Sequence, residues 1–294
     1  MEALQQEYQA VPSHLKKYFR PGAILCPRPA IESDLILGQS RMGGRPDLPP
    51  DHKWPEYENK HQVFIAQINL EELEGWAVPI GLPKSGHLFF FHDQDMSWQL
   101  GPKQENCPLV LYSSVPAKNL SRAEFPDDLR DEDKRRLCSV GIHCLQLQAP
   151  PWSQLYETFD SSNKDDVEVF KKYREDCIEY VSDALNRSDE DGERPWHVLG
   201  GFADIVQDPV ESECVSYFSD LSEEEQDEMT MEESLAFEEQ QDKAARDWLL
   251  LFQCDYDSIA DTCWYDMGKL FYMIRQQDLA SLAFDQTVAI IESH

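Results

Sequence analysis

The pattern of apolar and polar positions predicts a protein of mixed helices and strands. In residues 64–70 apolar side chains alternate with other residues, so that Gln67 and Asn69 share the opposite face of a predicted strand. Four consecutive apolar residues at 88–91 predict a second strand that is covered on both faces. Between residues 164 and 185 apolar side chains recur at three- and four-residue steps, which is typical of an amphipathic helix.

Weaker signals predict the remaining elements. We expect short helices over residues 2–10, 13–19 and 126–137, and strands over residues 31–37, 109–113, 142–147, 270–275 and 286–291. The stretch 45–55 contains four prolines and is predicted to be a loop, because proline does not fit a helix interior or a central strand.

The second half of the chain repeats the order of signals in the first half. Each half has a diglycine, then a strand with a central glutamine, then an aromatic strand that opens with a glycine. These features fall at 43–44, 64–70 and 86–91, and again at 200–201, 250–255 and 268–272. We therefore predict an α+β fold of mostly antiparallel sheets, one domain over residues 1–294. Its two pseudo-repeated halves are expected at about 24–150 and 190–294, linked by the helix at 164–185.

An acidic insertion in the second half changes the expected partners. Residues 211–242 contain thirteen Asp or Glu and no Lys or Arg, within a chain of formal net charge −30. This balance argues against nucleic-acid binding, which depends on clustered Lys and Arg. It favours a basic protein partner, because complementary potentials steer encounter, although acidity can also serve solubility alone.

Other features of the composition predict a cytoplasmic protein without a membrane segment. The longest apolar runs are far too short to cross a bilayer, and the acidic, polar N-terminus is unlike a secretion signal. Eight scattered cysteines with no CxxC pair predict free, mostly buried thiols in a reducing compartment.

Several motifs together resemble the YwqG-like family, bacterial proteins whose biochemical role is unassigned. The resemblance rests on residues 43–49, 54–55, 64–70 and 82–91, and on residues 199–201, 248–253 and 264–268. It implies an α+β fold with two related halves and supplies no catalytic residues. Tyr265 stands where the family often has a glycine, in a Trp-Gly-Asp motif. Some relatives are thought to be immunity proteins that neutralise toxins.

The sharpest candidate site is a set of matched polar residues. Gln67 and Asn69 correspond to Gln253 and Asp255, and if the halves pack about a pseudo-twofold axis, these side chains would converge on a ligand or partner. The alternative is that each buried amide satisfies backbone groups where a loop crosses the strand. Arg45 and Trp54, in the proline-rich loop, complete the candidate binding residues.

Other chemistries find little support in the sequence. The diglycines match no phosphate-binding motif and are better explained as tight turns. No metal is expected, because no CxxC or HxxxH pair is present, and no G-x-S-x-G nucleophile motif occurs. We expect no cofactor and no catalytic residue.

The sequence thus favours a non-catalytic protein-binding module, with neutralisation of a basic toxin as one form of this role. The alternative is a small-ligand sensor or enzyme that uses a cleft between the halves near Gln67 and Gln253.

Overall fold

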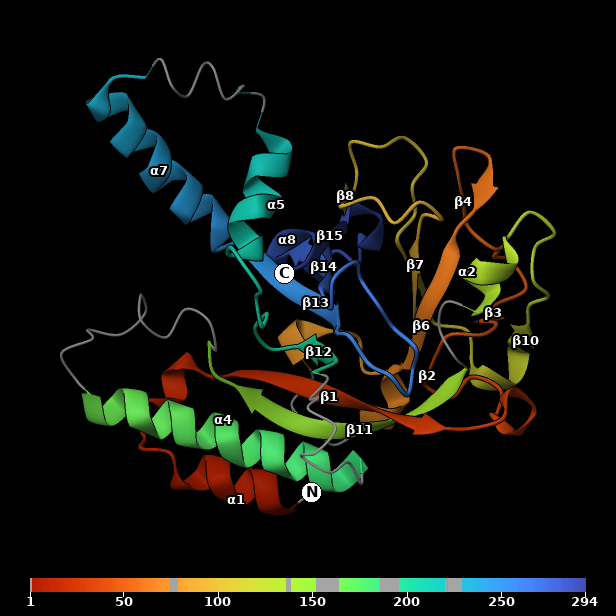
Figure 1. The fold of residues 1–294 in the computed structure, drawn as a ribbon, viewed down its shortest axis with the longest axis horizontal. Helices are drawn as coiled ribbons and strands as arrows, with labels where there is room; N and C mark the ends of the chain where they lie inside the picture. Colours follow the sequence, from red (N-terminus) through yellow and green to blue (C-terminus); the bar gives the residue numbers. More distant parts are fainter. Residues whose placement is uncertain are drawn as a thin grey trace.

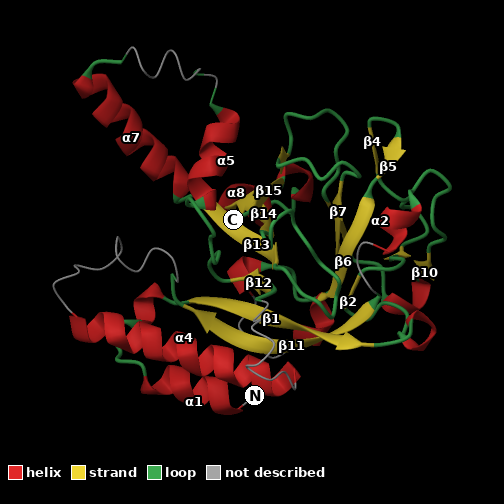
Figure 2. Cartoon of the chain, in the orientation of Figure 1, coloured by secondary structure: helices red, strands yellow, loops and turns green. Residues whose placement is uncertain are grey.

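The fold is built on one antiparallel sheet that curls into a half-barrel, with helices on its outside (Figures 1 and 2). The computed structural model describes residues 2–73, 79–135, 139–151, 164–185, 196–219, 221 and 229–294. Eleven strands follow the order β8-β15-β14-β13-β12-β1-β11-β2-β6-β7-β9. They are β1 (Arg20–Pro29), β2 (Arg41–Met42), β6 (Val63–Asn69), β7 (His87–His92), β8 (Gln99–Leu100), β9 (Val110–Ser113), β11 (Val140–Ala149), β12 (Val198–Gly200), β13 (Trp248–Cys254), β14 (Lys269–Arg275) and β15 (Val288–Glu292).

Short elements complete the described chain. Two small ribbons pair β3 (Asp47–Leu48) with β10 (Ser121–Arg122), and β4 (Glu56–Tyr57) with β5 (Lys60–His61). The α-helices are α1 (Glu2–Ala10), α2 (Asp131–Arg135), α4 (Lys164–Leu185), α5 (Val210–Phe218), α7 (Met231–Ala245) and α8 (Gln276–Ala280). Single 3₁₀ turns are η1 (Lys16–Tyr18), η2 (Glu32–Asp34), η3 (Leu70–Leu73), η4 (Pro79–Gly81), η5 (Ala117–Asn119) and η7 (Phe284–Gln286).

The two longest strands, β1 and β11, form the centre of the sheet. They pair through all ten residues, from Arg20 opposite Ala149 to Pro29 opposite Val140. Each takes one further neighbour, β12 beside β1 and β2 beside β11. Two arms therefore extend from the central pair: β2-β6-β7-β9, called here the first arm, and β12-β13-β14-β15, the second arm.

The arms face one another and enclose the main core. The ring of Phe90 on β7 lies 4.7 Å from that of Phe252 and 5.1 Å from that of Tyr272, which belong to the second arm. The Tyr272 hydroxyl donates to the carbonyl of Phe91 at 3.0 Å. One segment also crosses from the first arm to the second: β8, which follows β7 in the chain, pairs with β15. The curl of the sheet is thus fixed by aromatic packing between its two arms.

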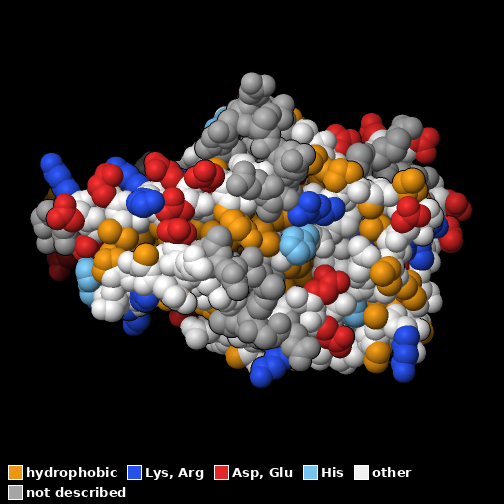
Figure 3. Space-filling model, turned by 90° about the horizontal axis from the view of Figure 1, so that it is seen from below, with side chains coloured by type: hydrophobic (Ala, Val, Ile, Leu, Met, Phe, Trp, Pro, Cys, Tyr) orange, Lys and Arg blue, Asp and Glu red, His pale blue; other side chains and the backbone are white. Residues whose placement is uncertain are grey.

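Helices α1 and α4 cover the central strands (Figure 1). A second core between them contains Phe170, Tyr173 and Cys177 from α4 together with Ile24 and Leu147 from β1 and β11. The apolar stripe predicted at 164–185 thus faces the sheet. Figure 3 looks onto this side of the molecule, where acidic, basic and apolar side chains are interspersed.

Most predicted elements are present, and the fold class of mixed helices and antiparallel strands is confirmed. The helices at 2–10 and 164–185 have the expected bounds. The predicted helix at 126–137 is limited to Asp131–Arg135 in the described residues. The strand predicted at 31–37 is wrong, because the chain there forms the 3₁₀ turn η2 with Ile31 and Ile36 more than two-thirds exposed.

The sequence analysis did not predict β1, whose three prolines are unusual in a central strand. The Leu25 amide donates to the His197 carbonyl, so the odd-numbered residues of β1 point their nitrogens toward β12. Pro21, Pro27 and Pro29 are odd-numbered, and β12 pairs only with residues 22–24. Within the described residues, the prolines therefore remove no hydrogen bond from the β1–β12 pairing at residues 22–24.

Two further expectations concern the whole chain. No helix in the described ranges is long and apolar enough to cross a membrane. Free thiols were expected to be mostly buried, and in the described part Cys107, Cys144, Cys177, Cys214 and Cys254 are buried free cysteines while Cys263 is exposed.

Candidate functional site

Each diglycine directs the chain out of a short strand and across the sheet. All four glycines, Gly43, Gly44, Gly200 and Gly201, have φ between 61° and 74°. This left-handed conformation is costly for residues with a Cβ, which explains glycine at all four positions. The loop that follows leaves buried backbone groups that no strand can satisfy.

Gln67 satisfies those groups in the first arm. Its side chain is fully buried, and its Oε1 accepts from the Asp47 amide at 2.7 Å. Its Nε2 donates to the Gln39 carbonyl at 2.8 Å and to Asp47 Oδ2 at 3.0 Å. Arg122 donates to the other carboxylate oxygen of Asp47. The side-chain amide therefore ties both ends of the diglycine loop to β6.

Gln253 does the same in the second arm. It is fully buried, its Oε1 accepts from the Asp204 amide at 2.9 Å, and its Nε2 donates to the Trp196 carbonyl at 2.9 Å. Here Lys269 supplies the cation, with its Nζ 2.7 Å from Asp204 Oδ2. The two glutamines thus make corresponding hydrogen bonds, four residues after the first glycine of each pair.

The neighbouring pair follows the same scheme. The backbone N–H of Asn69 donates to Ser40 Oγ at 2.9 Å, and the backbone N–H of Asp255 donates to His197 Nδ1 at 3.0 Å. The carboxylate of Asp255 accepts from the Trp196 amide, and burial raises its pKa above the ordinary value.

The structure does not bring these two sets of side chains together. Strands β12, β1, β11 and β2 separate β13 from β6 in the sheet, and each glutamine bonds only within its own arm. Neither glutamine lines the two pockets described below.

Arg45 and Trp54 are also held by structural contacts. Arg45 Nη1 lies 2.9 Å from Glu124 Oε2, and its amide donates to Glu32 Oε1. Trp54 is buried and donates from Nε1 to the Gln62 carbonyl at 2.7 Å. The aromatic residue of the proline-rich loop is therefore a packing anchor.

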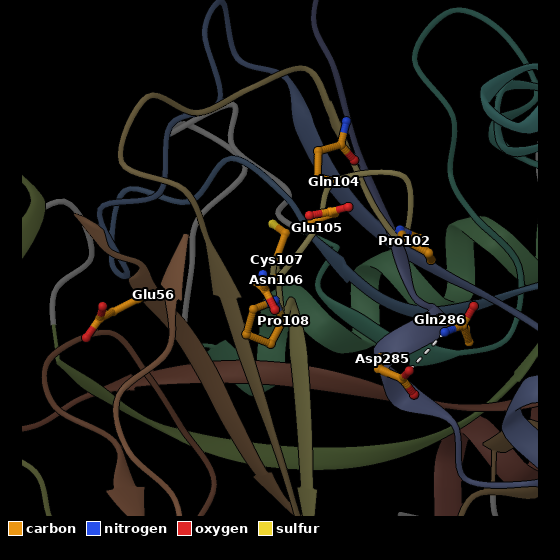
Figure 4. A pocket seen from close by; sticks show the side chains of 9 residues that line it. All are labelled: Glu56, Pro102, Gln104, Glu105, Asn106, Cys107, Pro108, Asp285 and Gln286. Carbon is orange, nitrogen blue, oxygen red and sulfur yellow. Dashed lines mark hydrogen bonds between the residues drawn. The ribbon is translucent and has the colours of Figure 1, made fainter. Parts of the chain in front are cut away.

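A pocket of about 460 Å³ lies where the arms meet (Figure 4). Its lining residues are Glu56, Pro102, Gln104, Glu105, Asn106, Cys107, Pro108, Asp285 and Gln286, of which none is basic. Figure 4 shows Glu56 on one side and Asp285 on the other, with residues 102–108 between them. Burial and the nearby Asp93 raise the pKa of Cys107 to about 12, so its thiol is a poor nucleophile at neutral pH.

A second pocket, of about 320 Å³, lies between α1 and β11. Glutamine side chains and Leu4, Tyr8 and Leu147 line it, without a charged group. In the described parts of the chain no group of three or more His, Cys, Asp or Glu is placed to hold a metal ion. His143 and Cys144 lie next to each other on β11, and burial raises the pKa of the Cys144 thiol well above its ordinary value.

The acidic segment 211–242 divides into a docked helix and an exposed one. Its residues 220 and 222–228 lie outside the described residues. Helix α5 buries Val210, Cys214 and Tyr217 against the second arm. Helix α7 has no buried residue and extends away from the sheet (Figure 1). A capping box between Thr230 and Glu233 stabilises its start.

Two carboxyl groups meet where α5 docks. Glu292 accepts from the amides of Val206 and Asp208, and Glu213 lies beside it. Burial and the Glu292 carboxylate raise the pKa of Glu213 from its ordinary 4.5 to about 7.

The sequence reading missed the pocket acids and one exposed aromatic pair. Trp98 is 51% exposed and Tyr265 is 47% exposed, and their rings stack. Only the unusual residue at Tyr265, within the Trp-Tyr-Asp motif, gave a signal in the sequence. The contact between the two rings joins loops that are far apart in the chain, so the local pattern of apolar residues cannot predict it.

The buried glutamines generate the first prediction. Replacing Gln67 or Gln253 by Ala leaves two or more buried backbone groups without partners, so each change should lower the free energy of unfolding by roughly 2–3 kcal/mol. Urea denaturation measures this, and Gln277→Ala on the exposed face of α8 should change stability by less than about 0.5 kcal/mol. Unchanged stability together with lost ligand binding would instead give the glutamines a direct binding role.

The raised pKa of Glu213 generates a second prediction. The folded protein binds more protons at this site than the unfolded chain between pH 4.5 and 7, so its stability falls as pH rises through that window. Glu213→Gln should therefore match the natural protein at pH 4 and exceed its stability by about 1 kcal/mol at pH 8. Thermal unfolding across this range measures the difference, which Glu232→Gln on exposed α7 should not show. A pH-independent difference for Glu213→Gln would contradict the raised pKa of Glu213.

Comparison with protein families gives one match, which covers most of the chain. The family model described as "Domain of unknown function (DUF1963)" matches residues 40–292, which include both diglycines and both glutamines. No individually curated protein matches the chain. The narrower resemblance to YwqG-like proteins stays a prediction from the motifs. The chain belongs to the DUF1963 family, a family of domains of unknown function.

Proposed function

We propose that this chain is a non-catalytic binding module whose partner is a basic protein. The observation that carries the proposal is α7, a helix of 15 residues with no buried side chain and five acidic residues. Helix α7 contacts α5 but buries none of its side chains, so it contributes little to the core and its acidic surface is available to another molecule.

The distribution of charge supports an attractive role for this segment. Residues 211–242 carry −13 of the formal net charge of −30, whereas the face over α1 and α4 mixes both signs (Figure 3). A concentrated acidic field raises the association rate of a basic partner, and salt screens it over about 10 Å at 0.1 M. Some relatives in the family that the motifs resemble are thought to neutralise toxins, so one form of this proposal is that the partner is a basic toxin, which the chain would neutralise by covering it.

A charge-matched pair of variants tests the role of α7. Replacing Glu232, Glu238 and Glu239 by Gln should slow the association of a nona-arginine peptide about three- to tenfold at low salt. The control replaces Glu168, Glu175 and Glu179 on exposed positions of α4 by Gln, which changes net charge equally. Stopped-flow fluorescence measures both rates, and the difference should vanish at 1 M salt.

Two outcomes would contradict this proposal. If nona-arginine does not bind the natural protein, the proposal that the protein binds basic partners is wrong. If both variants slow association equally, net charge alone is responsible and α7 has no special part.

A second candidate is the binding of a small cationic ligand in the 460 Å³ pocket. Three carboxylates line it, Glu56, Glu105 and Asp285, and its volume lies in the range usual for ligand sites. Gln67 and Gln253, which the sequence analysis proposed for a cleft between the halves, do not line this pocket.

Titration calorimetry with spermidine tests this candidate. Asp285→Asn should weaken spermidine binding about tenfold, because it removes one of the carboxylates that would pair with the ligand's ammonium groups. Asp278→Asn on α8 is the control and should leave affinity unchanged. Equal affinity in both variants, or no heat with the natural protein, would reject the pocket as a cation site.

We also infer that the two arms descend from one duplicated unit. Three observations support this. The sheet order is balanced about β1 and β11, and both glutamines bond the residue four positions after the first glycine of a diglycine. Phe90 and Tyr272 meet from equivalent places on β7 and β14. In this proposal the copies begin at β1 and β11, so that α4 lies inside the second copy rather than between the halves.

A further inference from the structure

Trp98 and Tyr265 form an exposed pair of stacked rings. Their ring centroids lie 3.9 Å apart with an interplanar angle of 6°, and about half of each residue is open to solvent. Trp98 lies between β7 and β8, and Tyr265 lies between β13 and β14, so the two rings come from segments far apart in the chain. The other tryptophans in the described ranges are buried. Trp98 is therefore exceptional in its exposure.

Hydrogen bonds hold the Tyr265 ring and the backbone of Trp98 in place. The Tyr265 hydroxyl donates to the Met96 carbonyl at 2.6 Å, and the Trp98 carbonyl accepts from the Ile291 amide at 2.8 Å. A preorganised aromatic surface loses little conformational freedom on binding, which is the property of residues that dominate interfaces.

The backbone around the pair is strained. Met96, Tyr265 and Met267 all have φ near 50°, in the left-handed region that favours glycine. Met267 is also 53% exposed. Such strain in non-glycine residues concentrates at functional sites, where the surrounding structure holds it. An exposed tyrosine in a glycine-like position needs a reason other than local stability.

The charge of the protein selects the kind of group that would cover these rings. The exposed Asp266 adjoins Tyr265, and no ion pair joins it to a basic side chain in the described structure. A guanidinium stacks on the face of Trp or Tyr and pairs with carboxylates, so an acidic surface with an open aromatic pair suits arginine. Lysine, a strongly hydrated point charge, gains less from a flat ring surface.

We propose that Trp98 and Tyr265 are the anchor on which an arginine side chain of the basic partner stacks. This inference rests on the proposed function and gives it a specific contact. Acidic α7 attracts the partner over distance, and the aromatic pair holds one of its arginines by direct contact.

Affinities for nona-arginine and nona-lysine peptides, measured with the whole 294-residue chain, test the anchor. Tyr265→Gly removes one ring and relieves the left-handed backbone, so the variant is expected to fold. It should bind nona-arginine about tenfold more weakly and nona-lysine less than about threefold more weakly. The matched control is Leu282→Gly, which has φ of 57° and is 46% exposed but lies near η7, and it should bind both peptides normally.

Two further variants complete the test. Trp98→Ala should reproduce the selective loss for nona-arginine, and Tyr265→Phe, which keeps the ring, should retain the preference for arginine. If Tyr265→Gly and Trp98→Ala bind both peptides normally, or lose both equally, the anchor is wrong. In that case slower association of the α7 variant would still uphold the proposed function. If the natural protein binds neither peptide, both proposals fail together.

Discussion

Pairing of β1 with β11 is the constraint on which the rest of the structure depends. Ten residues of each strand are matched, and each strand also carries the first strand of one arm. The arms therefore leave the centre in opposite directions and reach one another only because the sheet curls. Their aromatic contacts, centred on Phe90, Phe252 and Tyr272, then close the core. Without the central pair of strands, the two arms would not be held in one sheet and could not face each other.

The same geometry determines where polar groups are used. Each diglycine loop passes from β2 or β12 across a buried part of the sheet, so its backbone must find hydrogen bonds inside the protein. Gln67 and Gln253 supply them. Side chains that look like a ligand site in the sequence are thereby committed to the interior. The groups left for recognition lie on loops and on α7, outside the framework that the two arms share.

The sequence predicts the strongly patterned elements and misses those that depend on tertiary context. The stripe of α4 and the alternation of β6 are visible in their residues. The prolines of β1 argue against a central strand in the sequence. They are tolerated because β12 is short and pairs with β1 only at residues 22–24, which the sequence does not show. Ile31 and Ile36 led to the prediction of a strand at 31–37, but both side chains are exposed on either side of a 3₁₀ turn. The glutamines are identified as a matched pair, yet their partners cannot be read from spacing. The Trp98–Tyr265 pair joins residues far apart in the chain, which no local pattern records.

The central claim is that the buried side-chain amides of Gln67 and Gln253 hold the diglycine loops of the two arms in place. Amide hydrogen exchange at Asp47 and Asp204 tests it most directly, because these two backbone groups donate to Gln67 and Gln253. We predict that both exchange as slowly as the amides of β1, through global unfolding. Rapid exchange at either residue under native conditions, with β1 still protected, would contradict the account.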